Sequence, residues 1–239
     1  MTAFAEPDQL DPFARTARTR LIGLAAAMIV APWLQVAAET AHSVMTLHGD
    51  DLEPSGDLAL ASEHLTLDRW ASLAALLGAL LLVPAVLGVM RLVRTGAARL
   101  GLVGGVLTAA AYICYFAMVF QGFTTDAMVG VGGSTSQHEK VLQAVLHEPL
   151  TLWVYLLFVL GNVVGTFLLG LALVRARTAG RIAGYGLMAW PVLHLVGFPF
   201  AETVGATAQA VGFALAARAL LRQSARTDAS PRAYELLRR

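Results

Sequence analysis

The stretch "WASLAALLGALLLVPAVLGVM", residues 70–90, decides the fold class of this chain. It carries no charged side chain, and Arg69 and Arg91 bound it. At 1.5 Å of rise per residue, a helix of this length is about 30 Å long, which is the thickness of the hydrocarbon core of a bilayer. The stretch therefore predicts a membrane-spanning helix.

The composition of the whole chain supports the same class. Of the 239 residues, 57% are hydrophobic and 14% are charged, and the mean hydropathy is +0.65. A soluble domain of this size needs a more polar surface. Cys114 is the only cysteine and lies in an apolar run, which excludes an intramolecular disulfide and a Cys-based metal site.

Further apolar stretches predict an all-α, polytopic membrane protein with a bundle of six transmembrane helices. Its transmembrane domain covers residues 20–221, with outer loops at 42–68 and 122–149 and tails at 1–19 and 222–239. The turn Phe198-Pro199-Phe200 makes the last two helices antiparallel neighbours, because the residue before a proline avoids the helical region. The six predicted spans are 20–41, 69–91, 98–121, 150–174, 182–198 and 201–221.

The first stretch has a second interpretation as a signal peptide, with Arg15, Arg18 and Arg20 as its basic flank and "VAA" before Glu39 as a cleavage site. The leader before the apolar core would be unusually long. We therefore expect a transmembrane span at this position.

The distribution of basic residues predicts the orientation. Arginines fill the N-terminal tail, residues 91–99, residues 175–181 and the tail after residue 217, whereas Arg69 and Lys140 are the only basic residues on the other side. We therefore expect a multi-pass protein of the inner (plasma) membrane with both termini in the cytoplasm. All six histidines and most acidic residues fall on the outer side, so any chemistry should lie there, although acidic outer loops also simply complete the charge asymmetry.

Polar side chains within the spans follow helical spacing. Gln35, Glu39 and His42 stand at i, i+4 and i+7 and form one stripe. Ionisable residues at membrane depth are costly and indicate function. Four further stripes of this kind can line the same interior cavity: Thr108, Tyr112 and Tyr115; Tyr155, Asn162 and Thr166; Trp190 and His194; and Glu202 and Gln209.

Each stripe also has a purely structural explanation. Glu202 in the first turn of a helix is favoured by the helix dipole, and the carbonyl that Pro191 frees can satisfy His194. Glu39 with His42 can be an ion pair at the water boundary. Gly161 and Gly165 form a G-x-x-x-G pattern, which is typical of close helix packing.

Two resemblances to known proteins bear on function. The chain length, the number of spans and the acids within them resemble the small membrane-bound terpene cyclases of meroterpenoid and indole-sesquiterpene pathways. Paired acids on different helices are implicated in starting cyclisation in that family, which implies this role for Glu39 and Glu202. Residues 80–94 and 100–112 also resemble six-helix integral membrane proteins of GC-rich bacteria, which implies no activity.

Together these features predict a membrane-embedded, class II terpene-cyclase-like enzyme that performs acid-initiated cyclisation or isomerisation of a polyprenyl-type substrate. A carboxyl group buried among aromatic side chains can remain protonated near neutral pH, and aromatic faces attract a carbocation. Glu39 would be the acid or proton relay, tuned by His42, with Glu202 as the second carboxylate and His194 as a polar partner. Substrate contacts are expected from Trp33, Gln35, Tyr112, Tyr115, Trp153, Tyr155, Asn162 and Trp190.

Two other functions remain open at this point. His42 and His194 could hold a haem, a metal or a small amphiphile in a binding or transport protein, or the chain could be a non-catalytic structural subunit. For the enzyme we expect a lipophilic small-molecule substrate and the lipid bilayer as partners, no nucleic acid, no metal and no cofactor.

Overall fold

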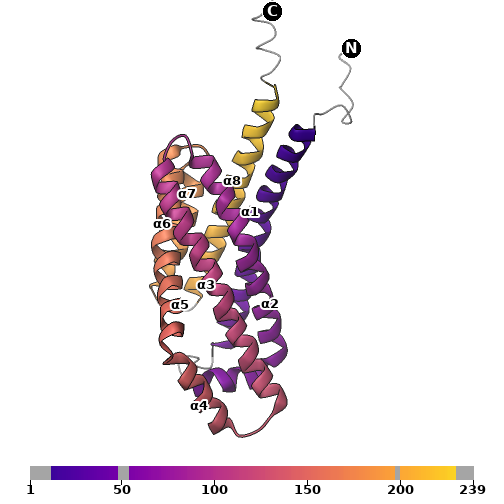
Figure 1. Ribbon diagram of the computed structural model, residues 1–239, viewed down its shortest axis with the longest axis vertical. Helices are drawn as coiled ribbons and strands as arrows, with labels where there is room; N and C mark the ends of the chain where they lie inside the picture. The colour runs from indigo at the N-terminus through magenta and orange to yellow at the C-terminus, as the bar shows by residue number, and fades with distance from the viewer. Residues whose placement is uncertain (1–11, 48–53, 197–199, 230–239) are drawn as a thin grey trace, which may run out of the picture.

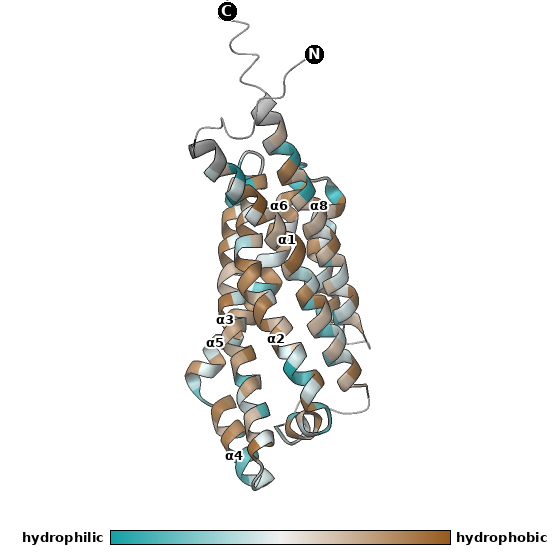
Figure 2. Ribbon diagram, turned by 90° about the vertical axis from the view of Figure 1, so that its right-hand side faces the viewer, coloured by the Kyte–Doolittle hydropathy of each residue, from teal (hydrophilic) through white to brown (hydrophobic). Residues whose placement is uncertain are grey.

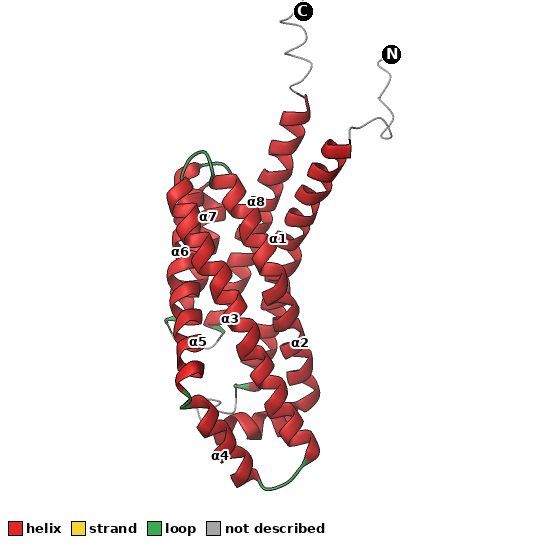
Figure 3. Ribbon diagram, in the orientation of Figure 1, coloured by secondary structure: helices red, strands yellow, loops and turns green. Residues whose placement is uncertain are grey.

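The computed structural model describes residues 12–47, 54–196 and 200–229, and these residues form helices with no strand (Figure 3). The described elements are α1 (Pro12–Met45), α2 (Pro54–Val93), α3 (Ala98–Val131), α4 (Thr135–Leu146), α5 (Pro149–Leu160), the π-helical segment η2 (Gly161–Gly165), α6 (Thr166–Ala176), α7 (Arg181–His194) and α8 (Ala201–Ala229).

The long helices form a closed bundle (Figure 1). Each packs against the next along the chain, from α1 through α2, α3, α6 and α7 to α8, and α8 packs back against α1. The start of α1 and the end of α8 leave the bundle at the same end, and the short helix α4 lies at the opposite end (Figure 1). This closed order brings residues near the two ends of the chain into contact.

Five helices are long and apolar enough to cross a membrane. The helical membrane fold expected from the sequence is thus confirmed at this level. The fifth predicted span, 182–198, corresponds to α7, which has 14 residues and is about 21 Å long. That is shorter than a hydrocarbon core of about 30 Å. The five candidate spans are Thr16–Met45, Pro54–Val93, Ala98–Val131, Pro149–Ala176 and Ala201–Gln223.

The two segments predicted as outer loops are largely helical. Helix α2 begins at Pro54 and bends at His64 (φ −124°, ψ 26°), and α3 runs on to Val131 before α4. Buried apolar residues hold these segments: Leu58 is 4% exposed and Leu142 is 3% exposed. Hydropathy marks where a helix leaves the lipid, not where the helix ends, so these helices run on beyond the predicted spans.

The last two helices are packed neighbours, as predicted. A Cβ atom at Gly186 of α7 would lie 3.0 Å from Gly212 Cα of α8, so the two backbones approach closely because both residues are glycine. The Phe198-Pro199 step predicted to form their turn lies outside the described residues.

The half of the bundle nearer the termini is a dense apolar core. Large side chains such as Met28, Leu82, Leu169 and Phe213 are fully buried there, among many alanines. Apolar residues predominate along the helices, and hydrophilic ones gather towards their ends (Figure 2). A groove of about 620 Å³ lies at the outermost end of this half, where Arg91, Arg94 and Gln223 line it. The cavities lined by the interior polar stripes lie in the other half.

The G-x-x-x-G pattern at Gly161 and Gly165 does mark a close contact, as predicted. A Cβ atom built at Gly161 would lie 2.7 Å from the Leu107 carbonyl oxygen. One built at Gly165 would lie 2.7 Å from the Thr108 amide nitrogen. The two glycines begin and end η2. Such π-helical turns are often found at functional sites, and this one holds Asn162 towards the interior at 2% exposure.

A substitution at Gly165 tests this contact. Gly165→Ala places a methyl group against the backbone of α3 and should destabilise the protein by about 1–3 kcal/mol, the usual cost of overpacking. The measurement is the thermal unfolding midpoint in detergent. Gly23→Ala is the matched control, because no atom lies within 4 Å of a Cβ built at Gly23; equal midpoints for the two variants would contradict the packing described.

Candidate functional site

The four residues predicted to be catalytic lie around one cavity. Glu39 and His42 come from α1, His194 ends α7, and Glu202 lies in the first turn of α8. All four line a space of about 380 Å³ in the half of the bundle away from the termini. Their helices are distant in sequence, and the cavity forms because α8 closes the bundle against α1.

The contact between His194 and Glu202 organises this cluster. His194 Nδ1 lies 2.9 Å from Glu202 Oε1, and both side chains are 35% exposed. The imidazole ring also stacks on the indole of Trp190, with ring centres 4.8 Å apart and planes 14° apart. Trp190 itself is 6% exposed, so a buried aromatic side chain holds the ring plane of His194.

Glu39 and Glu202 form a pair of carboxyl groups across the α1–α8 contact. Their side chains lie within hydrogen-bonding reach of each other, and His42 and His194 are the nearby basic groups. One turn away, Ser43 Oγ lies 3.1 Å from Thr203 Oγ1 and links the same two helices. Two carboxylates in contact repel, so such a pair is stable when it shares a proton.

A second, smaller cavity of about 100 Å³ lies beside the first one. Glu39, Tyr115 and His194 line both cavities. The smaller space is otherwise enclosed by polar and aromatic side chains, namely Gln35, Tyr112, Phe158, Asn162, Trp190 and Gln209. Glu39 therefore stands between a wider space at the mouth and a narrow pocket deeper in the bundle.

Aromatic side chains form one wall of the narrow pocket. Tyr115 stacks on Phe158 at a centroid distance of 5.0 Å, with 18° between the ring planes, and meets the edge of Tyr112 at 6.3 Å. The Tyr112 side chain is 4% exposed. Phe158 was not among the predicted wall residues, because α5 is apolar on all sides and its sequence does not reveal which face turns inward.

Buried amides complete this pocket. Gln35 Nε2 donates to the Ala75 carbonyl oxygen at 3.1 Å and ties α1 to α2. Asn162 Oδ1 accepts a hydrogen bond from Thr166 Oγ1 at 3.2 Å. Gln209 is 1% exposed, and the Tyr112 hydroxyl is a polar group within reach of its side chain.

Three of the predicted substrate contacts lie outside both cavities. Trp33 and Trp153 are 46% and 61% exposed and face away from the interior, and Tyr155 is half-buried and lines neither cavity. Trp33 stands two positions from Gln35, and Trp153 nine positions from Asn162. At about 100° per residue these separations place each tryptophan on the opposite side of its helix.

The sequence also missed Asp68, which lines the wider cavity from α2. It was assigned to an outer loop, where an acidic residue needs no special explanation. Because α2 begins 14 positions earlier at Pro54, Asp68 is instead part of a helix and is half-buried. Its position in the cavity follows from packing, and no local pattern in the sequence identifies it.

The side chains of this cluster suit proton transfer. The cluster combines two carboxyl groups with two imidazoles, each able to give or take a proton. Among the residues that the structure describes, no three His, Cys, Asp or Glu side chains converge on a point that a metal ion could occupy.

Comparison with family profiles, with curated proteins and with solved structures gives no match. The class of the protein thus comes from its own fold and site. It is an all-α protein with five candidate membrane-spanning helices, and by helix length and hydropathy it is a multi-pass membrane protein. Its interior holds a carboxyl–imidazole cluster at the junction of two cavities.

A disulfide trap tests the α1–α8 contact that builds this site. With Cys114 replaced by alanine, Ser43→Cys combined with Thr203→Cys should crosslink readily under mild oxidation, because the two native hydroxyl oxygens are 3.1 Å apart. Intramolecular crosslinking is read from electrophoretic mobility with and without reductant. Ser43→Cys with Thr207→Cys, one turn along α8, is the control, and faster crosslinking in the control pair would contradict the register described.

Proposed function

We propose that this protein is a membrane-embedded enzyme that starts the cyclisation or isomerisation of a lipophilic, polyprenyl-type substrate by donating a proton. The observation that carries the proposal is the position of Glu39, next to Glu202 and at the junction of the two cavities. In this arrangement His194 holds Glu202 as the carboxylate, and Glu39 keeps the proton because two adjacent carboxylates would repel.

The proposed reaction needs no other reactant. The π electrons of a substrate double bond take the proton of Glu39, which forms a C–H bond and leaves a tertiary carbocation and the Glu39 carboxylate. A second double bond attacks the cation and closes a ring. Loss of a proton from the carbon next to the final cation, to the Glu39–Glu202 pair, forms a new double bond and restores the acid. Substrate and product are isomers, and no electron is lost or gained.

The surroundings of Glu39 support this chemistry. Tyr115 and Trp190 line the narrow pocket beside it, and their π faces attract a cation. A volume of about 380 Å³ for the wider cavity lies at the lower end of the usual range for small-molecule sites. A lipophilic chain can enter from the bilayer, and the apolar core excludes the bulk water that would quench the cation.

The topology belongs to the same proposal. We propose six spans, with α7 as the short fifth one, both termini in the cytoplasm and the site near the outer face of the inner (plasma) membrane. The arginine distribution supports this orientation. The start of α1 and the end of α8 leave the bundle at the same end (Figure 1), as an even number of crossings requires.

Reporter fusions test the orientation. A green fluorescent protein fused after Arg239 should fluoresce, because it folds in the cytoplasm. Alkaline phosphatase inserted between Gly132 and Gly133, in the segment between α3 and α4, should be active, because it needs an oxidising outer compartment. The exchanged fusions are the controls, and activity of phosphatase at the C-terminus would reverse the orientation.

Glu39→Gln tests the acid. The amide keeps the shape of the side chain but has no acidic proton, so turnover should fall by about 10²–10⁴-fold, the usual contribution of a general acid. The assay incubates nanodisc-embedded protein with linear polyprenyl alcohols, their diphosphates and their terminal epoxides. It measures cyclic or isomerised products by gas chromatography and mass spectrometry.

The control for this variant is Glu139→Gln on α4, which removes a carboxyl group away from both cavities and should leave turnover unchanged. Thermal unfolding of both variants establishes that they are folded. Full turnover in folded Glu39→Gln would remove Glu39 from the mechanism.

A further inference from the structure

A third cavity lies between α2 and α3, apart from the Glu39 site. Its volume is about 430 Å³, and none of its lining residues lines the two cavities around Glu39. It lies where the apolar runs of α2 and α3 end, since Trp70 and Phe123 line it together with polar groups. Its other lining residues are Thr66, Arg69, Leu73, Asp126 and Ala127.

Asp126 is the unusual residue of this cavity. It is 2% exposed, and within the described part of the chain neither of its carboxyl oxygens has a hydrogen-bond partner. A buried carboxyl group without a donor costs several kcal/mol. The Asp68 carboxyl lies within hydrogen-bonding reach, so these two acids can share one proton, as Glu39 and Glu202 can. One shared proton serves only one oxygen of Asp126, and the other oxygen has no donor among the described residues.

The charges around Asp126 favour a cation as that donor. Asp68, Asp57 and Arg69 are the charged groups that act on it. Asp57 Oδ2 accepts from Thr125 Oγ1 at 3.4 Å and stays close to the cluster. Asp126 and Asp68 place two carboxyl groups beside each other at this point of the described chain, and an ammonium group with three N–H donors suits such carboxyl oxygens.

Arg69 adds the opposite charge to the same cavity. Its side chain is exposed, and although its charge acts on Asp126, it donates no hydrogen bond to either carboxyl oxygen. A cavity with an acid and a base that do not pair with each other matches a ligand that carries both charges. The guanidinium fork is well suited to a phosphate.

We propose that this cavity binds the headgroup of a lipid in which a primary ammonium is joined to a phosphate, as in phosphatidylethanolamine. The ammonium lies against Asp126, and the phosphate lies against Arg69. The acyl chains follow the apolar surface of α2 beside Leu73. This site does not depend on the function proposed for Glu39.

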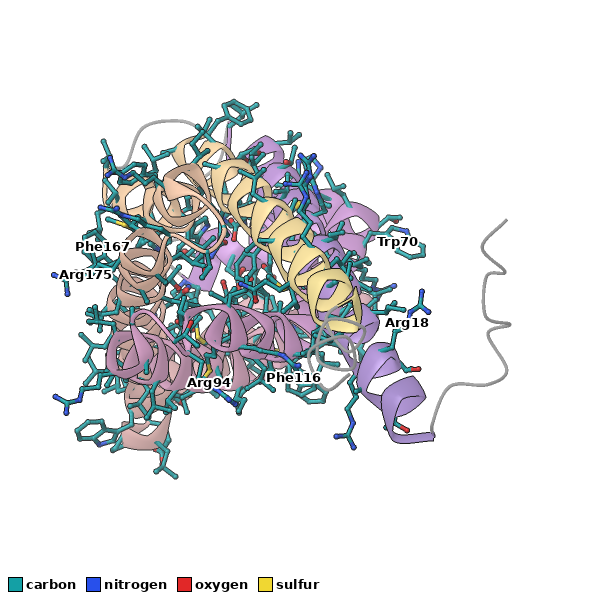
Figure 4. All side chains as sticks on the ribbon, turned by 90° about the horizontal axis from the view of Figure 1, so that it is seen from above. Arg18, Trp70, Arg94, Phe116, Phe167 and Arg175 are labelled. Atoms are coloured by element: carbon teal, nitrogen blue, oxygen red, sulfur yellow. The ribbon has the colours of Figure 1, made fainter. Side chains whose placement is uncertain are left out.

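The position of the cavity identifies a lipid as the source of this headgroup. Trp70 is 65% exposed and points away from the bundle (Figure 4). Tryptophan is enriched at the boundary between hydrocarbon and water, where a headgroup lies. Leu73, one turn into the apolar run, is 37% exposed and continues the surface towards the hydrocarbon.

A comparison of two lipids tests the ammonium contact. Phosphatidylethanolamine and phosphatidylcholine with the same acyl chains differ in the N–H donors, which the choline group lacks. Native mass spectrometry of the purified full chain, titrated with each lipid, should show tighter binding of phosphatidylethanolamine by roughly ten- to a hundredfold. This ratio corresponds to the usual strength of hydrogen bonds to a charged group.

Two variants assign that preference to residues. Asp126→Asn should remove the preference for phosphatidylethanolamine, and Arg69→Gln should weaken binding of both lipids because both carry the phosphate. Arg175→Gln and Glu139→Gln are the matched controls, since Arg175 projects outward from α6 (Figure 4) and Glu139 lies on α4. Circular dichroism and thermal unfolding verify the fold, and Arg69→Gln provides a second test if Asp126→Asn does not fold.

Three outcomes would overturn the proposal. The first is equal binding of the two lipids by the wild type. The second is an unchanged preference in folded Asp126→Asn. The third is that soluble glycerophosphoethanolamine competes as strongly as the lipid, which would identify a water-soluble ligand instead. Equal binding of the two lipids, together with loss of the infrared band of protonated carboxyl groups in Asp126→Asn, would show that Asp126 is satisfied by a proton shared with Asp68 and not by a lipid ammonium.

Discussion

The close contact of small residues in the half of the bundle near the termini is the constraint on which the rest of the structure depends. Lipid tails are as apolar as leucine side chains, so helices in a bilayer associate through tight packing. Here Gly104 meets the backbone of α6, Gly184 meets Gly170, and Gly186 meets Gly212. These contacts set the helices at one end, and the cavities open where the small residues give way to larger polar ones.

The polar groups of the open half are built in pairs that bridge helices. Glu39 and Glu202 meet across α1 and α8, and Asp68 and Asp126 meet across α2 and α3. The first pair has histidines beside it and faces an enclosed aromatic pocket, which suits proton transfer. The second pair has an arginine beside it and an exposed tryptophan, which suits a headgroup. Similar carboxyl pairs thus acquire different chemistry from their neighbours.

Much of the central site could be predicted from spacing alone. Gln35, Glu39 and His42 share one helix face. Gln35 and Glu39 line the narrow pocket, and Glu39 and His42 line the wider cavity. Trp33 and Trp153 were predicted from aromatic character and not from helical phase, and they lie on the opposite sides of their helices. Asp68 and Asp126 could not be predicted, since helix extension beyond the apolar run depends on contacts such as those of Leu58 and Leu142.

The sequence by itself determined that this is a helical membrane protein, and it determined the number of long apolar helices to within one. It also determined the side of each helix that carries polar groups. These properties follow from hydropathy and from the helical repeat, which are local. The tertiary structure decided which stripes meet, that Glu39 faces Glu202 and not another acid, and that Asp126 is buried without a donor. The first two depend on which helices become neighbours when α8 closes against α1, and the burial of Asp126 depends on how α2 and α3 pack beyond their apolar runs. No short-range pattern records these choices.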